Sequence, residues 1–448
     1  MITDLTVGRP SRALWKFTLP MLLSVAFQQL YTIADSVIVG KFVGENALAA
    51  VGASYPITML FMAVAFGVNI GCSVVISRLF GAKEYTEMKT TVYTSFLSSL
   101  VIGAALTAIG LLISAPLLQL LQTPDNVFAD AVVYLNIYLL GFLFLFFYNV
   151  CTGVFTSLGD SKTPLWFLIG SSLGNVVLDL IFVIPCGWGV AGAAWATFLA
   201  QGISAVLAFF VLLRRLRKIR TDEKPARFSK ESLREIVRIS IPSICQQSFV
   251  SVGNLFIQGL VNSFGSSVMA GYSAALRLNT FAITSFNAVA NALSSYTAQN
   301  IGAERVDRVK QGLKAGAVLA VCIAAPFMVA YIAFGESMTA LFLDTTADVA
   351  RALAVGRQFL LIVAPFYPAV MIKIVADGVL RGTGAMRAFM VATLADLVLR
   401  VAFSYLLSPL FDETGIWMSW PFGWVIGAVL SCWLLRQELK RREMEQWR

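Results

Sequence analysis

The sequence predicts an all-α membrane protein in which twelve transmembrane helices form two six-helix lobes related by a pseudo-twofold axis. Three observations predict this fold class: an apolar composition, twelve apolar stretches of spanning length, and an order of motifs that occurs twice. Hydrophobic residues make up 58% of the 448 residues and charged residues only 13%, whereas about 25% charged residues is usual for a soluble domain. The composition therefore places the chain in a lipid bilayer.

Twelve stretches are long enough to cross a bilayer, which takes about 20 apolar residues in a helix. The first stretch is longer than the apolar core of a secretory signal and lacks an obvious cleavage site, so we expect no signal peptide. The predicted spans are 14–38, 53–79, 93–116, 132–156, 164–185, 190–213, 236–262, 272–298, 313–334, 353–378, 388–409 and 414–435.

The second half of the chain repeats motifs of the first half in the same order. Gly81-Ala82 returns as Gly302-Ala303, and Gly153-Val154 returns at almost the same separation as Gly378-Val379. Six spans per half is an even number, so both halves begin on the same side, and the axis relating them lies along the membrane normal. We predict an N-terminal lobe at 1–213, a cytoplasmic linker at 214–235 and a C-terminal lobe at 236–448. Repeated bundles of this kind usually transport.

Basic residues gather in alternate loops. The connection 214–238 alone holds ten Lys and Arg against four acids, and the C-terminus is also basic. This distribution is the positive-inside pattern and predicts that both termini are cytoplasmic. We expect a multi-pass protein of a bacterial or archaeal plasma (inner) membrane. The net charge of +9 then serves orientation beside anionic headgroups, and we expect membrane lipids, not nucleic acid, as partners.

The sequence lacks the residues and motifs of several common kinds of enzyme site. The chain has no histidine, and its six cysteines form no CxxC pair, which excludes Cys/His zinc sites and Ser-His or Cys-His catalysis. It also lacks the GxxxxGK[ST] loop that binds ATP phosphates. We expect no enzyme activity and no cofactor.

Polar residues inside the first-half spans form the candidate cation site. An ionisable side chain at mid-membrane costs about 2.5–3.5 kcal/mol on insertion scales, so its presence calls for a reason. The four-residue spacing of Asn175 and Asp179 places them on one helix face. Oxygen ligands suit H⁺ or Na⁺ as the coupling ion, with Na⁺ held at Asp35, Asn175 and Asp179. The alternative is local hydrogen bonding between helices. The candidate residues are Asp35, Asn149, Asn175, Asp179 and Thr197.

The second half lacks this set and carries other charges. At the separation that relates Gly153 to Gly378, Arg400 stands at the position of Asn175 and Ser404 at that of Asp179. Lys373 with Asp377, and Asp396 with Arg400, are each spaced i, i+4, so the two charges of each pair could neutralise each other within a helix. Alternatively, these charges could form a polar wall of the substrate cavity. With first-half residues, the predicted cavity comprises Gln28, Tyr31, Tyr134, Arg277, Lys373, Asp377, Asp396 and Arg400.

Pro20 lies inside the first span. A proline within a helix removes one hydrogen bond and permits a kink. Because the same span carries Asp35, we consider a bend at Pro20 that is coupled to ion occupancy, beside a purely structural bend.

These residues resemble the multidrug and toxic compound extrusion (MATE) family of secondary transporters over essentially the whole chain. The motifs that carry the resemblance are Leu19-Pro20, the run from Gln28 to Asp35, the segment from Leu158 to Pro164, Asn175 with Asp179, and the segment from Leu380 to Gly384. The resemblance implies two lobes around a central cleft and export of drugs, often organic cations, against Na⁺ or H⁺. The first-half polar set is similar to the cation site of the DinF-like branch.

Two other functions compete with a multidrug antiporter. A flippase or exporter of lipid-linked or other amphipathic metabolites would keep the fold and use the basic residues Arg277, Lys373 and Arg400. A membrane aspartyl protease would use Asp35 and Asp179, but no motif around them matches, and the duplication has no role in it. The antiporter hypothesis expects small amphipathic organic substrates and a monomer.

Overall fold

The computed structural model describes residues 3–343 and 348–446, and every regular element in these ranges is helical. A π-helical segment η1 (Val39–Val43) continues the first helix, and a 3-10 turn η2 (Ala364–Phe366) joins two others. The helices are α1 (Pro10–Ile38), α2 (Glu45–Gly81), α3 (Tyr85–Leu120), α4 (Asp125–Ser157), α5 (Lys162–Val183), α6 (Gly189–Lys218), α7 (Lys230–Asn262), α8 (Ser266–Gly302), α9 (Val306–Ala340), α10 (Val349–Val363), α11 (Tyr367–Gly382) and α12 (Met386–Gln446).

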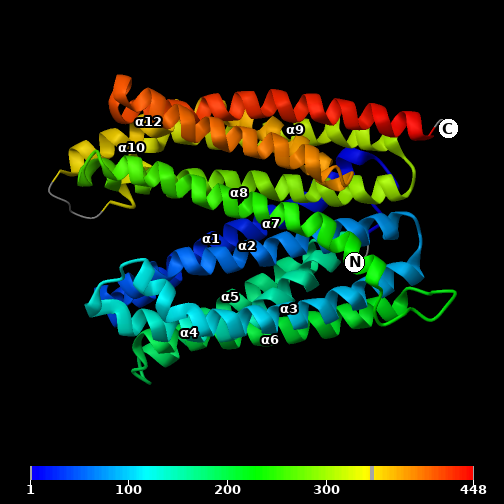
Figure 1. The fold of residues 1–448 in the computed structure, drawn as a ribbon, viewed down its shortest axis with the longest axis horizontal. Helices are drawn as coiled ribbons and strands as arrows, with labels where there is room; N and C mark the ends of the chain where they lie inside the picture. Colours follow the sequence, from blue (N-terminus) through cyan, green and yellow to red (C-terminus); the bar gives the residue numbers. More distant parts are fainter. Residues whose placement is uncertain (1–2, 344–347, 447–448) are drawn as a thin grey trace. The chain divides into compact units, whose positions relative to one another are not determined.

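Within the described ranges, nine helical segments are long and apolar enough to cross a membrane. One of them combines α10, η2 and α11 into Val349–Gly382. The helices α7 and α8 are long enough but too polar to meet the criterion, although we predicted spans at 236–262 and 272–298. The last span is α12, whose backbone is non-helical at Phe411 and Asp412. Figure 1 shows the chain reversing direction within α12, so two helices follow each other there.

The chain folds into two compact units that exchange the beginnings of their first helices. The first unit contains Leu19–Ile244 with the residues up to Asp4, and the second contains Leu5–Thr18 with the chain from Cys245 onward. The start of α1 therefore belongs to the second unit, and the start of α7 belongs to the first. Pro20 lies just after the crossing in α1, and α1 runs through it as one continuous helix.

The helix boundaries repeat in step with the sequence motifs. α2 and α8 begin at 45 and 266 after glycines of positive φ, Gly44 (116°) and Gly265 (97°), which are conformations that glycine adopts without steric cost. They end at the repeated glycines Gly81 and Gly302, so the two helices have the same length. The two units are thus built from the same succession of helices and turns.

The repeated glycines explain why the packing repeats as well. A side chain at Gly153 would lie 3.1 Å from the backbone oxygen of Asn69, and one at Gly378 would lie 2.6 Å from that of Ala290. Asn69 and Ala290 are themselves equivalent, because each precedes the last glycine of its helix, Gly81 or Gly302, by the same number of positions. Glycine therefore allows α4 to lie close against α2, and α11 close against α8.

Each unit has its own apolar core. In the first unit, α4 packs against α2, α3 and α6, and Phe142, which is fully buried, meets Phe61 edge to face at 5.2 Å. In the second unit, the Tyr272 ring stacks on Trp417 with ring centroids 5.0 Å apart. Such aromatic pairs contribute about 0.5–1.5 kcal/mol beyond the area that they bury.

The N-terminal residues are anchored by hydrogen bonds to the second unit. Leu5 is fully buried, and its backbone N–H donates to the side-chain oxygen of Gln299 at 2.8 Å. Arg305 and Arg308 donate to the carbonyl oxygens of Thr6 (3.0 Å) and Gly8 (2.9 Å). Just before this segment, the Thr3 N–H donates to the Leu158 carbonyl of the first unit at 3.0 Å.

We expect Gly159→Ala to destabilise the protein more than Gly384→Ala, its repeat-related control. Both glycines have positive φ (71° and 78°), so alanine costs about 1–2 kcal/mol at each. At Gly159 the new methyl group would also overlap the Thr3 carbonyl oxygen, whereas nothing lies within 4 Å at Gly384. Thermal unfolding of both variants in detergent measures the difference, and equal shifts would contradict the Thr3 contact.

Candidate functional site

Two neighbouring helices of the first unit place polar side chains where no solvent reaches them. Asn175 and Asp179 of α5 are 2% and 0% exposed, as expected for two residues on one inward-facing helix stripe. The Asn175 amide nitrogen donates to the hydroxyl oxygen of Thr197 on α6 at 3.3 Å. This contact joins two of the five predicted cation-site residues across the α5–α6 pair, and Asp179 lies one turn from Asn175 on the same helix.

Helices α1 and α4 bring further polar side chains to this position. Asp35 of α1 is half-buried and its carboxyl group interacts with that of Asp179, without a hydrogen bond of ordinary geometry between them. Tyr31, one turn before Asp35, interacts with Thr197. Tyr134 of α4 lies near both aspartates. The structure therefore gathers Tyr31 and Tyr134, which we had assigned to the substrate cavity, around the predicted cation site.

The decisive property of this cluster is an excess of acceptors. Both carboxyl oxygens of Asp179 and the amide oxygen of Asn175 are buried without a hydrogen-bond partner in the described part of the chain. No lysine or arginine within the described ranges forms an ion pair with Asp35 or Asp179. Two neighbouring carboxylates out of water cannot both remain charged without a proton or a cation. The cluster can therefore bind H⁺ or a hard cation such as Na⁺.

Asn149 of α4 has different contacts. Its amide nitrogen donates to the Leu145 carbonyl of its own helix at 2.8 Å, and its backbone oxygen accepts from Asn69 at 2.5 Å. The side-chain bond stays within α4, and the bond from Asn69 of α2 is a bond between helices of the kind that we considered as an alternative. The role of Asn149 as a cation ligand stays a prediction. Gln28, also predicted for the cavity, is exposed on α1.

The predicted charges of the second unit form a buried cluster. The Lys373 ammonium lies 2.7 Å from the Asp377 carboxylate on α11 and 3.7 Å from the Asp396 carboxylate on α12. The Ser431 hydroxyl donates to the other oxygen of Asp377 at 2.7 Å. One of the two expected i, i+4 pairs therefore forms, and Lys373 bridges two helices as well.

The other expected pair does not form. Arg400 makes no ion pair with Asp396 in the described chain, and its guanidinium lies over the Trp420 ring, 4.5 Å from the centroid. Gly423 and Gly427 bring the second half of α12 so close that a side chain at Gly423 would lie 2.7 Å from an Asp396 oxygen. The chain reverses at Phe411 and Asp412, and glycine at 423 and 427 allows the second half of α12 to lie against these charges. Arg277 is exposed instead, with its guanidinium 5.8 Å from the Phe342 ring centroid.

The motif from Leu158 to Pro164 has a structural role in the first unit. Asp160 lies just before α5 and accepts from the N–H of Thr163 at 3.1 Å and from its hydroxyl at 2.8 Å, and it forms an ion pair with Arg215 of α6. Sequence reasoning did not assign these partners or Ser431. The Asp-x-x-Thr spacing of a helix N-cap could have indicated the first of them.

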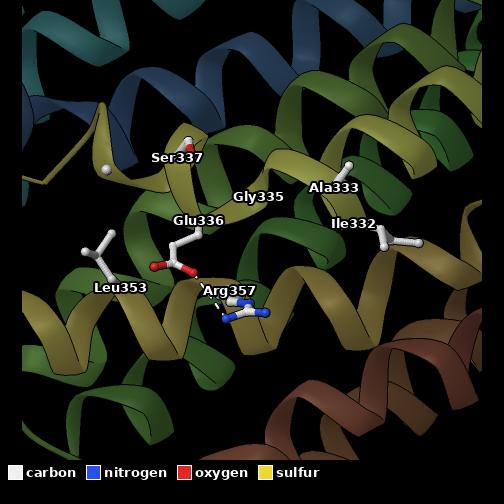
Figure 2. A pocket seen from close by; sticks show the side chains of 8 residues that line it. Ile332, Ala333, Gly335, Glu336, Ser337, Leu353 and Arg357 are labelled. Carbon is white, nitrogen blue, oxygen red and sulfur yellow. Dashed lines mark hydrogen bonds and ion pairs between the residues drawn. The ribbon is translucent and has the colours of Figure 1, made fainter.

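A separate surface cavity of about 340 Å³ lies between α9 and α10 of the second unit. Figure 2 shows Glu336 and Arg357 facing each other across it, and their charged groups are 3.2 Å apart. Both side chains are more than half exposed, and none of the predicted site residues lines this cavity. We assign it no function.

Comparison with known families agrees with this architecture. The MatE family profile matches residues 20–181 and 242–406, which is one match in each repeat and more than half of the chain. The chain belongs to the MatE family. Both matches begin at a repeated proline, Pro20 and Pro242, and this membership confirms the predicted MATE family, a family of transporters rather than enzymes.

Curated relatives of this MatE chain align over nearly its whole length. The probable multidrug resistance protein YpnP of Bacillus subtilis is 31% identical over 417 residues, 92% of each chain. The multidrug export protein MepA of Staphylococcus aureus is 24% identical over 96% of this chain and 94% of its own. A FAD transporter of Shewanella oneidensis is 24% identical over 67% of this chain and 68% of its own.

Solved structures share the fold of this MatE chain. A multidrug resistance MATE family transporter of the MOP superfamily, in an outward-facing conformation, has a TM-score of 0.92 at 24% identity and 99% coverage of both chains. A MOP superfamily transporter from Pyrococcus furiosus has a TM-score of 0.91 at 24% identity and 98% coverage of both. These likenesses confirm a multi-pass, all-helical membrane protein with the MATE fold.

Proposed function

We propose that this chain is a secondary active multidrug exporter that moves amphipathic organic compounds out of the cell against H⁺ or Na⁺. One observation carries the proposal: next to Asp35, the acceptors of Asn175 and Asp179 have no hydrogen-bond partner among the described residues, and they need a proton or a cation. The relatives named as multidrug resistance and export proteins support organic drugs as the cargo.

The coupling follows from competition for one acidic cluster. A cation that enters from outside neutralises Asp35 and Asp179 and changes the packing of α1 against α5 and α6. A cationic cargo loses its electrostatic attraction to the first unit at the same moment and is released. By linkage, each ligand lowers the affinity for the other by the same factor. The exchange then needs no ATP, because the ion gradient drives it.

The proposal includes the finer architecture predicted from the sequence. Counting α10 with α11 as one span, α12 as two, and α7 and α8 as spans would give twelve crossings. We propose that they form lobes 1–213 and 236–448 around a pseudo-twofold axis, with both termini cytoplasmic in the inner membrane. The position of the acidic cluster in the first repeat favours the DinF-like branch. Asp35, Asn175, Asp179 and Thr197 are the proposed ion ligands, with Asn149 and the bend at Pro20 as secondary elements.

Transport by the purified full chain in liposomes tests the function. A cationic dye is loaded, and an H⁺ gradient and a Na⁺ gradient are imposed in separate experiments. Dye movement that follows one gradient and stops when the gradient is collapsed supports antiport and identifies the ion. Dye movement that is equally fast with no gradient would indicate a passive pathway and contradict the proposal.

A second cargo class is favoured by one comparison. The aligned FAD transporter and the basic residues of the second unit are compatible with export of an amphipathic metabolite or a lipid-linked compound. A lipid-flipping assay in the same liposomes, beside the dye assay, distinguishes the two cargo classes.

A further inference from the structure

We propose that the second unit binds a negatively charged group of the cargo, a carboxylate or phosphate attached to an aromatic body, at Arg400. This inference rests on the proposed export function and specifies the chemistry of the compound exported. It adds an oxyanion site in the second repeat to the cation site in the first.

Arg400 is a buried cation whose expected partner is held elsewhere. Its side chain is 6% exposed, and its Nε–H has no hydrogen-bond partner in the described structure. Asp396, four residues earlier, is directed to the Lys373 ammonium instead. A buried guanidinium without a carboxylate is costly unless another anion completes its hydrogen bonds. The Trp420 face at 4.5 Å stabilises the charge but accepts no directed hydrogen bond.

The neighbouring aromatic residues add donors and flat apolar walls. The indole N–H groups of Trp417 and Trp420 are also buried without an acceptor in the described ranges. Both rings pack on Phe359, at 5.4 Å and 5.7 Å between centroids. Three N–H donors without an acceptor in the described ranges, beside rings that pack edge to face on Phe359, match an aromatic compound that carries an oxyanion, because guanidinium and indole N–H groups donate and cannot accept.

The buried charges around Arg400 carry a net positive charge that one more anion would balance. Lys373 neutralises part of the Asp377 and Asp396 pair, and Arg381, 7% exposed on α11, lies near Asp377 as a further cation. With Arg400, the buried cluster holds three basic and two acidic side chains. Among these described side chains, one acceptor lacks a hydrogen-bond partner, an oxygen of Asp396. This single acceptor is fewer than the three N–H donors of Arg400, Trp417 and Trp420 that lack an acceptor.

The two repeats differ in polarity at equivalent positions. Arg400 stands where the first repeat has Asn175, and Ser404, which is hydrogen bonded to Ser419 at 2.7 Å, stands where the first has Asp179. In the described structure, the orphaned groups at this place are acceptors in the first unit and mainly donors in the second. The first unit therefore calls for a positive ligand, and the second calls for a negative one.

A matched pair of dyes tests this site. Rhodamine 110 carries a free carboxylate, and rhodamine 123 is its methyl ester with the same cationic ring system. Binding of each dye to the full chain in phosphatidylcholine nanodiscs is followed by fluorescence polarisation. We expect wild type to bind rhodamine 110 about tenfold or more tightly than rhodamine 123, the effect of a charge-assisted hydrogen bond. Arg400→Gln removes this preference, and Arg400→Lys retains part of it.

The outcomes separate the site from the function. Equal affinities of the two dyes in wild type, or an equal loss of both in Arg400→Gln, would overturn the oxyanion site. So would a preference that disappears in phosphatidylglycerol nanodiscs, because a lipid headgroup would then be the occupant. Arg357→Gln, which changes an exposed arginine of the same unit, should leave the preference intact. Gradient-driven efflux of rhodamine 123 reports on the export function independently of this preference.

Discussion

Asp179→Asn is expected to abolish ion-coupled efflux while making the protein more stable. The substitution keeps the shape of the side chain but removes the charge that the coupling ion neutralises, so dye efflux should fall to that of protein-free liposomes. At the same time, a neutral amide takes the place of a buried carboxyl group whose two oxygens have no hydrogen-bond partner in the described structure. The amide can donate to the Asn175 oxygen or to Asp35. Relief of an unsatisfied buried group is worth about 1–3 kcal/mol, and a gain in stability with a loss of activity is usual at functional sites.

Gradient-driven efflux and thermal unfolding, measured on the same preparation, check both parts. Asp125→Asn, at an acid in the first turn of α4, is the matched control and should change neither quantity much. Wild-type efflux from the Asp179 variant would refute the proposed coupling site. A marked fall in its melting temperature would instead indicate that the carboxylate is structural.

Lys373→Met is expected to produce the largest loss of stability among the charge substitutions. It leaves Asp377 and Asp396 buried without the ammonium that lies 2.7 Å and 3.7 Å from them. Removing one partner of a buried ion pair usually costs about 3–5 kcal/mol. The exposed pair Arg357–Glu336 offers the control, since Arg357→Met should cost at most about 1 kcal/mol.

A double substitution distinguishes electrostatics from packing. Lys373→Met combined with Asp377→Asn should recover much of the stability lost in the single variant, because the uncompensated charge is removed together with its partner. Denaturation of the single and double variants in detergent gives the coupling. Additive losses would show that the aliphatic stem of Lys373, and not its charge, is what the cluster requires.

The family and the all-helical membrane fold could be predicted from the sequence because both depend on local patterns. Apolar length sets a span, and the regular separation of the paired glycine motifs identified the duplication before any contact was known. The same signal is weaker in α7 and α8, which are long enough to span a membrane but too polar to meet the composition of a span. Helix ends that are polar, such as the first turn of α3 at Tyr85, lay outside the predicted spans because the spans were identified from apolar residues alone.

The charge of a side chain and its position along a helix can be read from the sequence. The sequence was therefore enough to identify the charged side chains that are costly to bury in a membrane. It was also enough to place Asn175 and Asp179 on one stripe. Which of the polar groups find partners depended on the packing of the helices: Asn149 bonds within its own helix, Lys373 lies between acids of two helices, and Asp179 and Arg400 are left incomplete. The reason is that helical periodicity defines the face on which a residue lies but not what the neighbouring helix presents to that face.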